Sequence, residues 1–218
     1  MVDFETNWNA DSYYSSALGL KIGSNFTITN DGLNATFDSG TYTSAKDNYE
    51  NSTLSYDTTD DIQWGEWNIT YTYASSPANE QGYWIAGKIT DTSQIDTLIS
   101  NNSTATFNGY ALGHSTGSAG ALNASNSTVQ LNIDFGAAAS ESINGTFTFS
   151  DATINVTSAT PVTNSGFTFQ QTGDASYGGN GAFFGENASS VGGNFVLKAN
   201  TYKYSGVFKA KESNRGND

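Results

Sequence analysis

The clearest pattern in the chain is a strict alternation of apolar and polar residues after residue 101. In the cleanest segment, apolar positions from Val129 to Phe135 alternate with polar positions from Thr128 to Asp134. A period of two residues places the apolar side chains on one face of a β-strand. Further short apolar runs predict about eight strands, centred on residues 105–111, 129–135, 143–149, 154–156, 167–169, 182–184, 195–197 and 207–208.

The short polar turns between these runs predict antiparallel neighbours that follow one another in sequence. A sheet of eight such strands can close on itself and so remove both edges, and a two-sheet sandwich is the alternative. The sequence therefore predicts an all-β fold in which residues 101–211 form an eight-stranded antiparallel up-and-down barrel and residues 212–218 form a polar tail. Glycines would permit the tight coiling of a small barrel at Gly109, Gly113, Gly145, Gly181, Gly185 and Gly206.

Residues 1–100 are less regular and predict a separate β-rich handle domain. The turn-forming Asn30-Asp31-Gly32 lies between apolar runs at 26–28 and 35–37, which is typical of a hairpin. A tryptophan-rich hairpin is predicted at 62–88, with a polar loop at 75–82. Its aromatic residues are interpreted as core, with an exposed platform for sugar or haem as the alternative. Residues 93–100 predict a short helical turn that leads into the barrel.

Composition narrows the function. The chain has 218 residues, and its 13% aromatic residues are enough to supply a core. Its net charge of −13 would repel phosphate backbones and anionic bilayers. We therefore expect neither nucleic acid nor a membrane surface as a partner. Most of the cations come late, at Lys198, Lys203, Lys209, Lys211 and Arg215. Lysines on outward strand faces discourage pairing between sheets, and an anion site is the alternative.

The chain contains no cysteine, which excludes a disulfide scaffold, a thiolate zinc site and a cysteine nucleophile. No apolar run reaches the length of a transmembrane segment. The first residues lack the basic and apolar regions of a signal peptide, so we expect an exported protein of this sequence to be a mature fragment.

The region after residue 180 resembles a known family. Gly181-Ala-Phe-Phe-Gly185, Gly192-Gly-Asn-Phe-Val-Leu197 and Gly206-Val-Phe-Lys-Ala-Lys211 are similar to the C-terminal barrel signature of transferrin-binding protein B. Related surface lipoproteins and secreted haem-binding hemophilins share this signature. Looser matches lie at residues 105–109 and 134–136, and the segments Trp64–Trp67 and Tyr83–Gly87 resemble parts of large bacterial surface proteins.

The resemblance implies an eight-stranded barrel preceded by a β-rich handle, on or secreted from Gram-negative cells. Family members bind host iron proteins, haem or complement regulators through loops, and the resemblance carries over no catalytic residues. The matched residues fix turns and barrel closure, so they are not expected to form the binding site. The lipid-anchoring cysteine of the lipoprotein members has no counterpart in this sequence.

His114 is the only histidine and the only candidate cofactor ligand, because imidazole commonly ligates haem iron. An exposed histidine at the end of a strand is the simpler interpretation. The carboxylates of Asp57, Asp60 and Asp61 lack the spacing of a calcium loop. No carboxylate pair or nucleophile elbow predicts catalysis, so we expect a protein that is not an enzyme.

Two functions follow as hypotheses. The first is a surface-exposed or secreted bacterial protein that captures a host protein or haem through loops on a barrel scaffold. The second is a structural or adhesion domain, or a polymerising subunit, of a larger assembly at the cell surface, in which the N-terminal residues would self-associate by strand addition. Either protein would be located outside the cell or on the outer-membrane surface.

Overall fold

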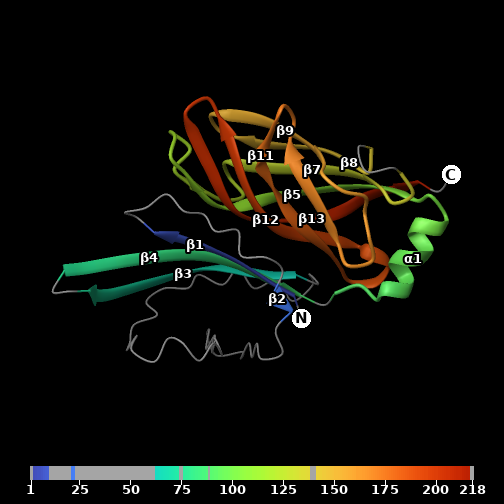
Figure 1. Cartoon of the computed structure of the whole chain (residues 1–218), viewed down its shortest axis with the longest axis horizontal. Coiled ribbons are helices and arrows are strands. Elements are labelled where there is room, and N and C mark those ends of the chain that lie inside the picture. Colours follow the sequence, from blue (N-terminus) through green and yellow to red (C-terminus); the bar gives the residue numbers. More distant parts are fainter. Residues whose placement is uncertain are drawn as a thin grey trace.

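The computed structural model describes residues 2–9, 21–22, 62–73, 76–87, 89–137 and 141–216. These residues form two β-sheets and one α-helix (Figure 1). The hairpin predicted at residues 26–37 and the carboxylates at 57–61 lie outside the described residues.

The larger sheet is a closed antiparallel barrel of eight strands, as the sequence predicted. In order around the barrel, each strand pairs with the next, and β13 returns to pair with β5 from Tyr204–Ser115 to Gly216–Thr104. This pairing excludes the open sandwich. A ninth short strand, β6 (Ala121–Leu122), adds to β5. The barrel strands are β5 (Thr104–Ser115), β7 (Ser127–Asp134), β8 (Ile143–Phe149), β9 (Ala152–Ser158), β10 (Phe167–Gln171), β11 (Asp174–Phe184), β12 (Ser190–Ala199) and β13 (Tyr202–Gly216).

The last strand is longer than the sequence indicated. Residues 212–216, which we expected in a polar tail, continue β13 and pair with the start of β5. A register shift between Glu212 and Asn214 accommodates this extension. Polar side chains are compatible with a strand here, because strands are paired by hydrogen bonds between backbone groups and not by their side chains.

The barrel interior is a packed core of aromatic rings. Phe147 lies at its centre, with ring centroids of Phe169, Phe195 and Phe208 between 5.1 and 5.6 Å away. Residues of α1 (Thr92–Ser100) close one end of the barrel, which we call the helix end. Ile95 and Leu98 of this helix are buried with the barrel core. With nine residues α1 is too short to cross a bilayer, and the described ranges contain no other α-helix.

The smaller sheet lies along one side of the barrel (Figure 1). Its strand order is β2 (Lys21–Ile22), β1 (Val2–Asn9), β4 (Ser76–Gly87) and β3 (Ile62–Tyr73), all antiparallel. The predicted polar loop at 75–82 was wrong over most of its length, because β4 already begins at Ser76. Seven register pairs with β3, from Tyr73–Ser76 to Trp67–Gly82, and three with β1, from Asn9–Glu80 to Asn7–Gly82, provide the backbone partners that this polar segment needs.

A second, smaller core joins the two sheets. Ile62, Trp64, Tyr83 and Ile85 of the hairpin are buried together with residues of the outer barrel wall, Ala182, Phe184 and Val207. The sequence predicted one apolar and one polar face for every barrel strand, and this was wrong for β11–β13. Residues 181–184 of β11, 190–195 of β12 and 204–210 of β13 are buried on both faces, since the hairpin covers this part of the wall from outside. The double burial explains the continuous apolar runs of the family signature.

Glycines allow close contacts between neighbouring strands of the wall. A side-chain carbon at Gly193 would lie 1.8 Å from the carbonyl oxygen of Asn180, and one at Gly109 would lie 1.9 Å from that of Lys209. Neither contact can be relieved by a side-chain rotation, because both involve backbone atoms. The strands therefore approach each other at these points only because the residues lack a side chain.

Candidate functional site

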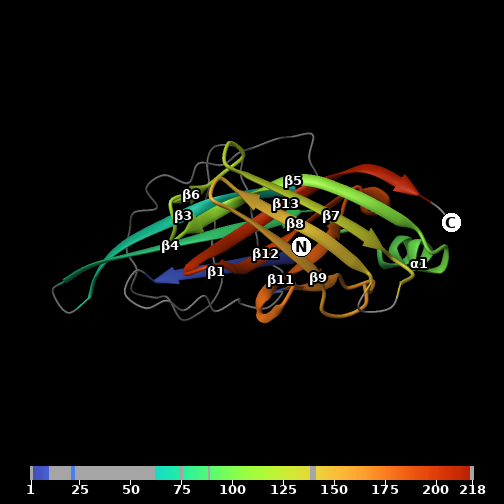
Figure 2. The same cartoon turned by 90° about the horizontal axis from the view of Figure 1, so that it is seen from above.

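The end of the barrel opposite α1 carries the candidate binding surface, and we call it the loop end. Four connections meet there, at residues 116–126, 150–151, 172–173 and 200–201. In both views the ends of β3 and β4 that are joined by their turn point to the same side as this end, whereas α1 lies on the other side (Figures 1 and 2). Binding residues on loops are typically positioned by a rigid scaffold of this kind.

Asp151 holds three segments of the loop end together. One carboxylate oxygen accepts a hydrogen bond from the Tyr204 hydroxyl at 2.8 Å. The other accepts from the Ser118 hydroxyl at 3.0 Å and from the Ala119 backbone N–H at 2.9 Å. The Tyr204 ring is completely buried and stacks on Phe149, with 4.4 Å between centroids and 9° between planes. The connection after β5 is therefore fixed to the turn after β8 and to β13.

The hydrogen bonds shift the protonation of both groups. Burial alone would raise the pKa of Asp151, but the hydrogen bonds from Tyr204, Ala119 and Ser118 outweigh it and hold this pKa below its ordinary value of 3.8. Burial raises the pKa of Tyr204 to about 12, and the hydrogen bond and charge of Asp151 act in the same direction. At neutral pH the pair is thus an ionised carboxylate and a neutral phenol.

We expect Asp151→Asn and Tyr204→Phe each to reduce the free energy of unfolding by about 1 kcal/mol at neutral pH, because each leaves partly buried polar groups with fewer partners. Because the pKa of Asp151 is lower in the folded protein than in the unfolded chain, its contribution to the free energy of unfolding is complete above pH 3.8. This contribution is lost as the pH falls through the folded pKa. The folded pKa of Tyr204 is raised, so its contribution is complete below pH 10.0 and is lost as the pH rises toward about 12.

Urea unfolding of the wild type and both variants across this pH range measures the effect. The difference in the free energy of unfolding between the wild type and Asp151→Asn should become smaller as the pH falls below 3.8. Asp174→Asn is the control, since Asp174 lies at the same end and accepts a backbone N–H from Ser176 without a buried partner. If Asp174→Asn lowered the free energy of unfolding as much as Asp151→Asn, the contacts of Asp151 would contribute no more to stability than those of an ordinary surface carboxylate.

Polar side chains also fix the connection that follows β6. The Asn126 amide donates to the carbonyl oxygens of Ala121 and Ala119 at 2.8 and 3.2 Å. The Ser127 hydroxyl lies 2.7 Å from the Asn123 carbonyl oxygen and 3.0 Å from that of Ala111, and the Ala111 N–H donates back to it. Loops held in this way lose little conformational entropy when a ligand binds.

The loop end also presents aromatic and basic side chains. Tyr202 is 42% exposed and is the only large hydrophobic side chain so exposed among those that the structure describes. The Lys198 Nζ lies 5.6 Å from the centre of the Tyr177 ring. Lys198 and Lys203 are directly opposite each other in the β12–β13 register. We call Tyr177, Lys198, Tyr202 and Lys203 the basic tip.

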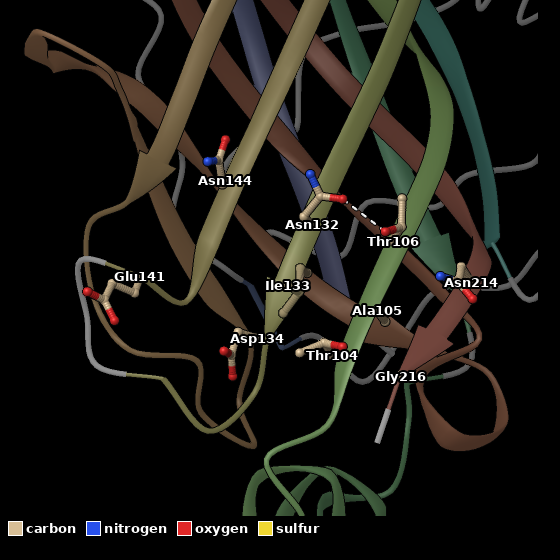
Figure 3. A pocket seen from close by; sticks show the side chains of 10 residues that line it. All are labelled: Thr104, Ala105, Thr106, Asn132, Ile133, Asp134, Glu141, Asn144, Asn214 and Gly216. Carbon is tan, nitrogen blue, oxygen red and sulfur yellow. Dashed lines mark hydrogen bonds between the residues drawn. The ribbon is translucent and has the colours of Figure 1, made fainter. Parts of the chain in front are cut away.

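A shallow hollow of about 160 Å³ lies on the outer wall near the helix end (Figure 3). The Thr106 hydroxyl donates to the Asn132 side-chain oxygen at 2.9 Å across its floor. Asp134 and Glu141 supply carboxylates on one side, and Asn144 and Asn214 supply amides. The lining residues are mostly polar, with Ala105 and Ile133 as the apolar side chains, and none is aromatic. A shallow hollow without aromatic side chains favours solvated strand surface over a pocket for an apolar ligand.

His114 is the penultimate residue of β5 and so lies at the end of the strand, as the sequence predicted. It shares the outward strand face with Tyr110 and Leu112, pairs with Ser205 and Ala121, and is half-buried. It therefore points away from the barrel interior, which phenylalanine rings fill. Neither the hollow of Figure 3 nor a second one of about 90 Å³ beside Ile62 and Lys209 is lined by His114.

The described rings of the hairpin form core, as the sequence predicted, and not the exposed platform that was the alternative. Trp64 and Tyr83 are buried against the barrel wall, and Trp64 packs edge-to-face on Tyr110 at 4.8 Å. The Lys209 Nζ lies 5.1 Å from the Trp64 ring centre and 5.9 Å from that of Tyr110. No group of three or more potential metal ligands occurs among the described residues.

Comparison with known proteins reveals the same fold in bacterial surface proteins. Transferrin binding protein B of Neisseria meningitidis aligns with 98% of this chain at 18% identity and a TM-score of 0.60. A variant of the same protein from Haemophilus parasuis aligns with the whole chain at 12% identity and a TM-score of 0.54. A surface lipoprotein aligns with 97% of this chain and 98% of its own length, at 16% identity and a TM-score of 0.50.

The chain spans about half the length of the transferrin binding proteins, covering 44% and 45% of them. No family model and no curated protein matches the sequence. The described part of the chain thus has the all-β, eight-stranded barrel fold that is also found in these transferrin binding proteins.

Proposed function

We propose that this chain is a binding module, not an enzyme, that captures a host protein at the bacterial surface or outside the cell. The main support is the construction of the barrel. Its interior is filled with aromatic rings and closed by α1 at one end and by the Asp151 contacts at the other, so a ligand binds on the outside. The pinned loops of the loop end offer a preorganised surface. The shared fold makes transferrin the first ligand to test.

The absence of cysteine allows the site to be located with single-cysteine variants. We expect wild-type protein to bind immobilised transferrin saturably and albumin not at all. A polyethylene glycol chain attached at Ser125→Cys, in the loop end, should block binding. The same chain attached at Ser165→Cys, an exposed position near α1, should leave binding unchanged. Binding to neither transferrin nor other serum proteins would contradict the proposed function, and equal blocking at both positions would contradict the loop end as its site.

A structural or adhesive role, with self-association by strand addition, is the second candidate function. Within the described residues β3 pairs only with β4 and forms one edge of the small sheet, and a twelve-residue edge offers unpaired backbone groups to another strand. Light scattering after size-exclusion chromatography decides between the two roles. Discrete oligomers or fibres that persist on dilution would favour self-association, and a monomer would argue against it.

Haem capture through His114 stays a prediction of the sequence. Its test is a haem titration followed by the Soret band. No shift, or the same shift in His114→Ala, would remove His114 as a ligand.

A further inference from the structure

The basic tip brings two like charges together at the loop end. Lys198 and Lys203 face each other directly across β12 and β13, and like charges in this arrangement destabilise a sheet. Lys198 forms no ion pair with a described residue, although the chain carries 21 acidic residues and only 8 lysines and arginines. The two lysines also bring a net charge of −13 closer to zero, so they do not serve solubility.

Protection of a sheet edge does not explain these lysines. β12 pairs with β11 and β13, and β13 pairs with β12 and β5, so neither strand has a free edge along the barrel. Lysines at an unpaired edge discourage pairing with another sheet, and neither strand has such an edge. Lys198 and Lys203 lie on outward strand faces, as the sequence predicted, but not at an edge, and their position at the loop end also suits the alternative, recognition of an anionic group.

The basic tip is held rigidly from both sides. The Lys203 N–H donates to the Thr116 hydroxyl and the Thr116 N–H donates to the Lys203 carbonyl oxygen, both at 2.9 Å. On the other side the Lys198 N–H donates to the Gln171 side-chain oxygen at 2.9 Å. Tyr202 packs against the backbone of Gly117, where a side-chain carbon would lie 2.8 Å from its ring. An exposed tyrosine beside fixed cations is a low-entropy anchor for a protein partner.

We propose that the basic tip docks onto an acidic patch of the protein partner, with Lys198 and Lys203 engaging carboxylates and Tyr202 supplying apolar contact. The inference rests on the proposed function, since it names the chemistry that the loop end presents to its ligand. Nucleic acid carries negative charge as well, but the net charge of −13 repels a long phosphate backbone. A protein surface can place a few carboxylates at the tip without bringing further charge near the rest of the chain.

The test uses two anionic probes of similar charge, a polyglutamate peptide and a single-stranded oligonucleotide of about ten units each, at about 50 mM salt, where screening is weak. Backbone amide signals of the wild-type protein are followed during titration. Polyglutamate should shift the signals of residues 177 and 198–203. Lys198→Glu should weaken this binding by about tenfold, as expected for a charge at the contact. Lys211→Glu is the matched control, because it makes the same charge change on the same strand face as Lys203, eight residues away.

Each outcome bears on the proposal. No shift at the tip, equal weakening by Lys211→Glu, or stronger binding of the oligonucleotide would overturn it. The variants are also compared with wild type on immobilised transferrin. If the wild type did not bind transferrin, transferrin would be excluded as the ligand. The polyglutamate titration alone would then test whether the basic tip binds carboxylates. If wild type and Lys198→Glu bound transferrin equally well, the proposed role of the basic tip would be wrong, whereas the proposed function would be supported.

Discussion

Phe147→Ala is expected to lower the free energy of unfolding by about 3–5 kcal/mol, the range for removing a large buried aromatic side chain. Phe147 is fully buried at the centre of the barrel. Its ring is stacked on Phe169, with centroids 5.6 Å apart, and meets Phe208 edge-on at 5.5 Å. Because rings from several strands meet there, the barrel cannot collapse around the missing ring without moving more than one strand. Urea unfolding followed by far-UV circular dichroism measures the loss.

Thr146→Ala is the neighbouring control. Thr146 lies on the outer face of the same strand, where its hydroxyl donates to Asn155 at 3.2 Å. An exposed bond of this kind contributes little, so we expect a change of less than about 1 kcal/mol. A loss below about 1.5 kcal/mol for Phe147→Ala would be too small for a close-packed interior. It would mean that the barrel has room inside, and the proposal that ligands bind only on its exterior would lose its main support.

The barrel could be predicted from sequence because its strands alternate with a period of two and follow one another around the sheet. The pattern from Val129 to Phe135 matches the burial of β7 residue by residue. The polar start of β4 could not be predicted, since its side chains give no apolar alternation and the partners of residues 80–82 in β1 lie more than 70 residues away along the chain. The double burial of β11–β13 was also hidden, because a run of apolar residues does not say which segment covers its second face.

The candidate site was less accessible to sequence reasoning than the fold. Asp151 follows Ser150 in an ordinary polar turn, and its partners Ser118 and Tyr204 are 33 and 53 residues away. No local spacing connects them, so only the closed barrel brings them together. The lysines of the basic tip were visible as a late cluster of positive charge. Their opposition depends on the register of the β12–β13 hairpin, which begins at the pair Ala199–Tyr202.

Trp64→Ala is expected to destabilise the contact between the small sheet and the barrel by about 3–5 kcal/mol. Trp64 is 1% exposed and packs against Tyr110 of the barrel wall. The substitution also removes one of the two rings beside the Lys209 ammonium group, which is itself 8% exposed. A buried cation that loses an aromatic face loses up to about 2 kcal/mol of attraction. The substitution should therefore destabilise the packing of the hairpin on the barrel and leave the barrel core intact.

The distribution of tryptophan makes this separation measurable. Trp8, Trp64, Trp67 and Trp84 are the four tryptophans of the chain, and all precede the barrel. Fluorescence therefore reports on the handle, whereas far-UV circular dichroism is dominated by the barrel strands. In the wild type both signals should change at the same urea concentration, because the shared core couples the sheets. In Trp64→Ala the fluorescence transition should move to lower urea and separate from the circular dichroism transition.

Lys209→Met tests the charge without removing the apolar stem of the side chain. If the cation adds to the packing, the double variant Trp64→Ala/Lys209→Met should be less destabilised than the sum of the single changes, by about 0.5–2 kcal/mol. Coincident transitions in Trp64→Ala with no loss of stability would show that the hairpin contributes nothing to the fold of the barrel. The handle would then be a separate unit, and the double burial of the signature strands would have no energetic role.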